Sequence, residues 1–155
     1  MRKFGTFISL LFLIAIIGFA APSSSISDSK EKAKDDRFIA NDNGVVKDTE
    51  TSLEWYAGPD KDTSWNEAKK WAESLNVASG GWRMPTIKEL KALYKMGVGK
   101  RNMTPLLKTT GWQVWSGETK DSSSSWGFGF GSGFEALDNR AFSSNKRGFA
   151  VRSRR

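Results

Sequence analysis

Basic and aromatic side chains around two loop regions have the clearest potential for chemistry in this 155-residue sequence. Residues 98–111 form a basic stretch, and residues 117–125 form a polar stretch rich in serine. Indole faces suit both the C–H faces of saccharides and cations, while guanidinium and ammonium groups bind anions. The pattern therefore predicts a binding surface for a glycan, a polyanion or a surface protein. The candidate ligand-binding residues are Trp112, Trp126, Lys100, Arg101, Lys108, Arg152 and Arg154.

Three other patterns could support catalysis, but each has a simpler interpretation. Ser27 to Lys30 and Ser143 to Lys146 match the S-x-x-K pattern of a serine nucleophile with a lysine base. The first lies in a polar linker and the second in a polar turn, where chance matches are expected. Glu118 with Asp121 could act in acid–base chemistry or bind a cation, but a solvated loop is the favoured interpretation.

The composition excludes several classes of enzyme and site. The sequence contains no His and no Cys, which excludes Ser-His-Asp and Cys-His catalysis, Cys/His zinc sites and disulfides. Lys and Arg number 24 against 17 Asp and Glu, a net charge of +7. We expect a non-enzymatic protein with no cofactor and no metal site. The basic balance fits either a polyanion-binding surface or simple solubility.

The N-terminus has the pattern of a secretory signal. Arg2 and Lys3 precede an apolar run from Phe7 to Phe19, and cleavage is predicted after Ala20. An uncleaved membrane anchor is the alternative, although the run is shorter than the roughly 20 residues that span a bilayer. The protein is thus expected to be periplasmic or secreted, without a stable membrane span after cleavage. Export also disfavours nucleic acid as a partner.

The rest of the chain predicts a flexible linker and one folded domain. Residues 21–36 are Ser-rich and then mixed in charge, typical of a linker, and the domain covers residues 37–155. Capping boxes at Ser64 and Thr86 each predict the start of a helix, the second ending near Gly97. Strands before and after the helices give an α+β fold. The predicted strands are 38–40, 45–46, 53–56, 112–115, 126–131, one near Phe142, and 148–152.

The tryptophans are expected to form most of the core. Four lie in the most regular segments and should be buried: Trp55, Trp65, Trp71 and Trp82. Trp112 and Trp126, beside the loops, are the ones expected to be exposed, and with Trp115 they could form a stacking platform for sugar rings. In residues 126–131 aromatics alternate with glycines, so a glycine face is available for close packing.

Two segments give the chain a family resemblance. Residues 37–55 and the block Trp82-Arg83-Met84-Pro85-Thr86-Ile87-Lys88-Glu89-Leu90 resemble the opening and the "WRLPtikEL" signature of the Lcl C-terminal domain family. The resemblance implies a C-type-lectin-like fold, with two helices packed on a small twisted antiparallel sheet, long loops and paired terminal strands. Arg83 is expected to pair with a structural carboxylate or with carbonyl oxygens. The signature residues are Trp55, Trp82, Arg83, Pro85, Glu89, Leu90 and Trp115.

Members of this family are typically exported bacterial proteins, some regarded as adhesin-like, and the resemblance implies the same here. The triplets by which calcium-dependent lectins hold metal and sugar are missing from the sequence, and so are the cysteines of formylglycine-generating enzymes. The leading hypothesis is an exported binding module. The alternatives are a structural or accessory envelope protein with a protein partner, and a hydrolase that relies on carboxylates and hydroxyls.

Overall fold

A computed structural model describes residues 30–154 of the protein. The predicted signal segment and residues 21–29 of the predicted linker lie outside the described residues. The described end of that linker differs from the prediction, because β1 (Glu31–Asp35) pairs antiparallel with β2 (Phe38–Asn41). Four of the five β1 side chains are exposed, so the strand lacks the alternation that distinguishes a half-buried strand from a polar linker. Backbone pairing holds it in place.

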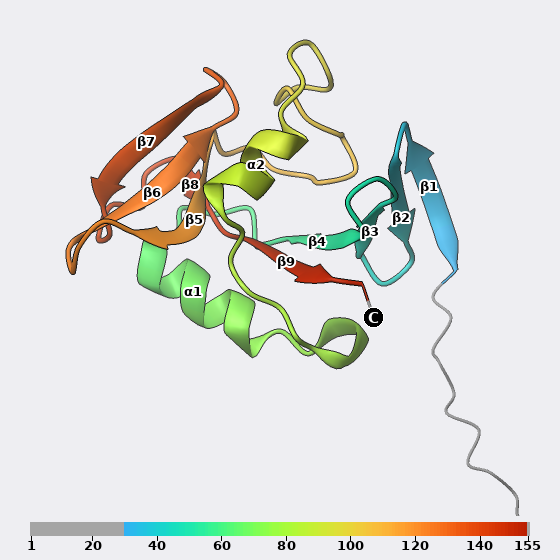
Figure 1. Cartoon of the computed structure of the whole chain (residues 1–155), viewed down its shortest axis with the longest axis horizontal. Coiled ribbons are helices and arrows are strands. Elements are labelled where there is room, and N and C mark those ends of the chain that lie inside the picture. Colours follow the sequence, from blue (N-terminus) through green and yellow to red (C-terminus); the bar gives the residue numbers. More distant parts are fainter. Residues whose placement is uncertain (1–29, 155) are drawn as a thin grey trace, which may run out of the picture.

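The first sheet has five antiparallel strands in the order β1-β2-β3-β4-β9. The hairpin from β2 to β3 (Val46–Asp48) turns at Gly44, whose φ of 84° favours glycine. β4 (Leu53–Ala57) then pairs along its whole length with β9 (Phe149–Ser153), which arrives from the other end of the described chain. Figure 1 shows these two strands crossing the centre of the molecule. The strands predicted at 38–40, 45–46, 53–56 and 148–152 are confirmed.

The second sheet has four strands in the order β7-β6-β5-β8. β5 (Gln113–Thr119), β6 (Ser124–Gly129) and β7 (Phe134–Asn139) form an antiparallel meander, whereas β8 (Lys146–Arg147) runs parallel to β5. Residues 30–154 therefore form two sheets instead of the one small antiparallel sheet that was predicted. The strand predicted near Phe142 is wrong, since this residue lies in an exposed turn after β7. β7 itself was not predicted, because three of its six side chains are exposed and three are half-buried, without a clear alternation.

Both predicted helices are confirmed with their capping boxes. Ser64 accepts from the amide of Glu67 at the start of α1 (Trp65–Ser74), and Thr86 does the same for Glu89 at α2 (Ile87–Leu93). A 3-10 turn, η1 (Val77–Ser79), follows α1. α2 ends four residues before Gly97, because Tyr94 adopts an extended conformation and the chain turns into a long loop.

The paired strands β4 and β9 separate two cores. Directly opposed residues of an antiparallel pair point to the same face. Trp55 and Val151 accordingly lie in one core with α2, and Tyr56 and Ala150 belong to the other with α1. Figure 1 shows α1 and α2 on opposite sides of this pair of strands. The burial of Trp55, Trp65 and Trp82 is confirmed, while Trp71 is only partly buried.

The core that contains α1 is the second core, and the signature block, residues 82–90, connects it to β9 and α2. Backbone hydrogen bonds in both directions join Arg83 to Val151, and the Trp82 indole donates to the carbonyl oxygen of Val77. The Arg83 guanidinium pairs through both terminal nitrogens with Glu89, at 2.6 and 2.9 Å. The predicted structural role of Arg83 is confirmed. Pro85, Leu90 and Trp115 are buried.

Candidate functional site

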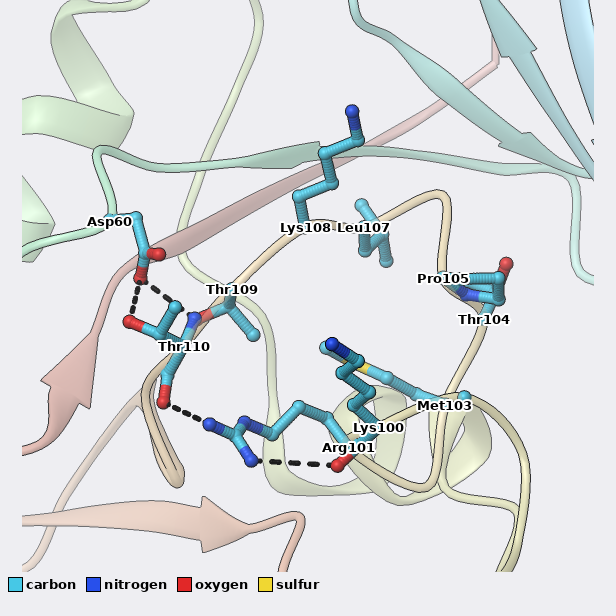
Figure 2. Close-up of a pocket in the computed structure, with 11 residues that line it drawn as sticks. Asp60, Lys100, Arg101, Met103, Thr104, Pro105, Leu107, Lys108, Thr109 and Thr110 are labelled. Atoms are coloured by element: carbon cyan, nitrogen blue, oxygen red, sulfur yellow. Dashed lines mark hydrogen bonds between the residues drawn. The ribbon is translucent and has the colours of Figure 1, made fainter.

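A pocket of about 390 Å³ lies in the long loop that joins α2 to β5 (Figure 2). Ligand pockets are typically of this size or somewhat larger. The pocket combines three basic residues, three threonines and an apolar wall, and one carboxylate comes from the loop after β4. Its lining residues are Asp60, Gly99, Lys100, Arg101, Met103, Thr104, Pro105, Leu107, Lys108, Thr109 and Thr110.

Asn102 and two buried apolar residues fix the loop on the protein body. The Asn102 side chain accepts from the amide of Gly97 at 2.9 Å and donates to the carbonyl oxygen of Phe130 at 2.8 Å. Met103 and Leu107 are buried in the core that contains α2. The pocket therefore stands on the domain core, with polar and basic groups above an apolar wall.

Arg101 connects the start of the pocket loop to its end. Its guanidinium donates to the carbonyl oxygen of Thr110 at 2.5 Å and to that of Lys100 at 3.5 Å. The same group lies 4.0 Å from the centroid of the Trp112 indole. Figure 2 shows it reaching toward Thr110, so that Arg101 links the two ends of the segment that forms the pocket. The predicted ligand residue thus has a structural role as well.

Asp60 fixes the opposite side of the pocket. Its Oδ1 accepts from the amide and the hydroxyl of Thr110, at 2.9 and 3.0 Å, and from Nε of Arg147 at 2.8 Å. Asp62 accepts from the same guanidinium at 2.8 Å. Burial alone would raise the pKa of the Asp60 carboxyl, but the hydrogen bonds from Arg147 and Thr110 outweigh it and lower the pKa to about 2. Asp60 is therefore charged at neutral pH and already paired.

Lys100 and Lys108 are the exposed cations of the pocket. Both side chains are exposed, and within residues 30–154 no carboxylate forms an ion pair with Lys100, Arg101 or Lys108. The one carboxylate that lines the pocket is bound to Arg147. The ammonium groups of Lys100 and Lys108 are thus available to a negatively charged group that enters from solvent, and Arg101, whose terminal nitrogens donate to carbonyl oxygens, adds its positive charge. The structure brings these three predicted ligand residues together.

The predicted indole platform is not formed. Trp115 is buried, and its indole donates to the carbonyl oxygen of Thr63. Trp126 is half-buried in β6 opposite Leu137 and packs against the core, which differs from its predicted exposure. Trp112 is 49% exposed, as predicted, but one face of its ring lies under Arg101. Of these three tryptophans, Trp112 alone lies beside the pocket, because Trp126 packs against the core from β6.

Arg152 and Arg154 lie away from the pocket. Arg152 is nearly buried, pairs with Glu54 at 2.7 Å, lies over the Trp82 ring and donates to the carbonyl oxygen of Gly80. The prediction that it binds a ligand is wrong, because its donors are used within the core. Arg154 is exposed just after β9, where its backbone amide donates to Ser52.

The carboxylates considered for catalysis stabilise local backbone. Glu118 accepts from the first amide of α2 at 3.2 Å. Asp121 accepts from the amides of Ser123 and Ser124, and these hydrogen bonds lower the pKa of its carboxyl. The lysine of the second S-x-x-K match, Lys146, is buried and paired with Asp138 at 2.5 Å. No arrangement of a nucleophile with a free base is visible among these groups.

Sequence reasoning did not find Asp60, Thr110 or Arg147 as parts of the site. Asp60 and Arg147 are far apart in the chain, and neither lies in a recognisable motif. Gly111 leaves room for Arg147, because an added Cβ there would lie 2.4 Å from Cγ of Arg147, but a single loop glycine does not identify that partner in the sequence. Within the described residues, no helix has the length and apolar character needed to cross a membrane.

The comparisons identify a family but no function. The model of the Lcl C-terminal domain matches residues 44–152, which include the whole pocket and both cores except Phe38 and Ala40. The match begins in the hairpin before β3 and ends within β9. No curated protein matches the chain.

Proposed function

The chain belongs to the Lcl C-terminal domain family, and we propose that its domain is a non-enzymatic binding module for an anionic glycan or another polyanion. The observation that carries this proposal is the loop pocket, which three cations line without a carboxylate partner among the described residues. The proposal places the anionic group between Lys100 and Lys108, beside the Arg101–Thr110 contact.

The chemistry of the lining supports this class of ligand. Ammonium groups attract carboxylate or sulfate oxygens without demanding one fixed geometry, and threonine hydroxyls both donate and accept hydrogen bonds. Pro105 and Leu107 offer an apolar wall to the C–H face of a sugar ring. Trp112 borders this region through its contact with Arg101. A polymer that repeats an anionic sugar would meet all of these groups.

Two further proposals concern the setting of this module. We propose a C-type-lectin-like fold, which the pairing of β4 with β9 and the two helices on either side of them support. We also propose that the protein is exported to the periplasm or secreted, for which the pattern of residues 1–20 is the support. An adhesin-like role would follow from export together with polyanion binding.

The proposal is tested with dextran sulfate as the anionic probe and neutral dextran as its control, titrated calorimetrically at two salt concentrations. The expected result is binding of dextran sulfate alone, weakening as salt rises. Lys100→Ala with Lys108→Ala should lower the affinity at least about tenfold, since each pocket cation contributes on the order of 1 kcal/mol.

A matched control removes the same amount of charge elsewhere. Lys70→Ala with Lys88→Ala changes two exposed lysines on α1 and α2, neither of which lines the pocket. This pair should keep most of the affinity. Equal losses in the two double variants would mean that overall charge, rather than the pocket, binds the polymer. If no polyanion bound, a structural role with a protein partner would replace the proposal.

A further inference from the structure

Three of the four most exposed large apolar side chains of the described residues lie at one end of the molecule. Met96 is 79% exposed, Trp112 is 49% exposed and Phe134 is 73% exposed. The fourth, Phe142, is 61% exposed and lies beyond the other end of β7. None of the three lines the pocket. Single exposed apolar residues are common on proteins, so their grouping is the feature that needs an explanation.

Strand register places Trp112 and Phe134 at the same end of the second sheet. Phe134 lies opposite Gly129, and Gly129 lies opposite Gln113 on its other side. Trp112 directly precedes Gln113, and its carbonyl oxygen accepts from the amide of Phe130 at 2.9 Å. Both exposed rings therefore flank the turn from β6 to β7.

Met96 reaches the same end through Asn102. The turn that contains Met96 is closed by hydrogen bonds from the amides of Lys95 and Gly97 to Asn102, whose side chain donates to Phe130. Tyr94, two residues earlier, packs against Gly133 of the β6–β7 turn. Figure 1 shows the loop after α2 and the β6–β7 turn at the same end of the molecule.

The charges around this end are positive. Glu135 is ion-paired with Lys91, and Asp36 is ion-paired with Lys95. Lys100 and Arg101, in contrast, have no carboxylate partner among the described residues. The three apolar side chains thus stand beside unneutralised cations, a combination that matches the interface of an anionic bilayer, where aromatic rings sit among headgroups and lysines meet phosphates.

We propose that this end of the domain docks on an anionic phospholipid surface, with Met96, Trp112 and Phe134 inserted among the headgroups. The three side chains come from separate segments, which are the turn after α2, the residue before β5 and the first residue of β7, and none of them lines the pocket. A lipid surface accommodates such an arrangement, and the neighbouring cations add attraction for phosphate. The apolar part of the inference is independent of the polyanion pocket, because Met96, Trp112 and Phe134 lie outside it, whereas the neighbouring cations Lys100 and Arg101 belong to its lining.

The test measures sedimentation of the protein with vesicles of phosphatidylcholine alone and with vesicles that contain phosphatidylglycerol. Binding to the anionic vesicles only is expected. Met96→Ser with Phe134→Ser should lower partitioning roughly tenfold, from the loss of two inserted apolar groups. Phe142→Ser, at the far end of β7, is the matched control and should bind like the unchanged protein. Met96, Phe134 and Phe142 are all largely exposed, so both variants should fold like the unchanged protein.

A second readout follows Trp112, the most exposed indole of the described chain. Anionic vesicles should shift its fluorescence to the blue, and Trp112→Phe should remove the shift while keeping binding. The proposal is overturned if vesicles are not bound, or if Phe142→Ser lowers binding as much as the double variant. Binding that depends on Lys100 and Lys108 but not on the apolar residues would also overturn it, and would leave the polyanion pocket intact.

Discussion

The Arg101 guanidinium lies over the indole of Trp112, 4.0 Å from its ring centroid, and donates from the same group to the carbonyl oxygen of Thr110. One side chain near the start of the pocket loop thereby contacts both the end of the loop and the exposed indole that follows it. A planar guanidinium can stack and donate at once, whereas an ammonium cannot do both with this geometry. The ends of the pocket loop are thus held together by a residue that also contributes to the positive charge of the pocket.

Replacing Arg101 with Lys should separate these two roles. The charge is kept, but the stack and the hydrogen bond to Thr110 are lost, so the loop over residues 99–110 should open more often. We expect faster amide exchange in this loop and at least about a tenfold loss of dextran sulfate affinity, since a hydrogen bond to a charged group contributes roughly 1.5–3 kcal/mol. Unchanged exchange and affinity in Arg101→Lys would mean that charge alone matters.

Low pH should reduce the stability of the protein by protonating Asp60. The pKa of this carboxyl is lowered in the folded protein from 3.8 to about 2. Its contribution to stability is therefore full above pH 4 and is lost as the pH falls from about 4 to about 2. Asp60→Asn should lower the melting temperature at pH 7, and the gap to the unchanged protein should narrow across this window. A gap that stays constant down to pH 2 would contradict the assigned pairing.

Replacing Arg152 should affect stability far more than replacing Arg154, although both arginines lie near the C-terminus. Arg152→Ala leaves the Glu54 carboxylate, 8% exposed, without its partner and should cost roughly 3–5 kcal/mol of unfolding free energy. Arg154→Ala removes an exposed side chain and should change stability little. Urea unfolding of both variants provides the measurement, and equal effects would show that the Glu54–Arg152 pair is not structural.

Trp82→Ala tests the second core. The ring is buried between Arg152 and Tyr56, so its removal should cost roughly 3–5 kcal/mol. Trp112→Ala, which removes a ring of the same kind from a half-exposed position, is the control and should cost clearly less. A near-unchanged melting temperature for Trp82→Ala would contradict the core assignment.

Gly131 should be intolerant of a side chain because of Trp112. An added Cβ at this position would lie 2.5 Å from Cε3 of the indole, so the ring must move away from the β6–β7 turn. Gly131→Ala should shift the fluorescence of Trp112 and weaken its stack with Arg101. Spectra of Gly131→Ala and Trp112→Phe provide the check, and an unaltered emission spectrum for Gly131→Ala would speak against this contact.

Local signals in the sequence predicted the helices and most strands. The capping boxes at Ser64 and Thr86 and the alternation in 126–131 need only neighbouring residues, and the structure confirms the elements they predict. β1 was missed because it is polar on both faces. The glycines of that alternating segment serve close packing, as expected, since Gly131 lies against Trp112 and Gly127 near Trp115.

The site could be predicted only in part, because its partners are distant in sequence. Lys100, Arg101 and Lys108 were found because they share one loop. Arg152 looked equivalent by residue type, yet Glu54, 98 residues away, makes it part of the core. The role of Asp60 likewise depends on Arg147, 87 residues later. Composition shows that cations are in excess, whereas tertiary pairing decides which of them remain available.

The most direct test of the central claim is a titration of the labelled protein with a short sulfated oligosaccharide, followed by amide chemical shifts. The account predicts saturable shifts that concentrate in residues 99–112 and at Asp60, and that vanish in the Lys100→Ala, Lys108→Ala double variant. Shifts centred on β1 and β2 or on residues 117–125, or the same shifts in the double variant, would contradict binding in the pocket.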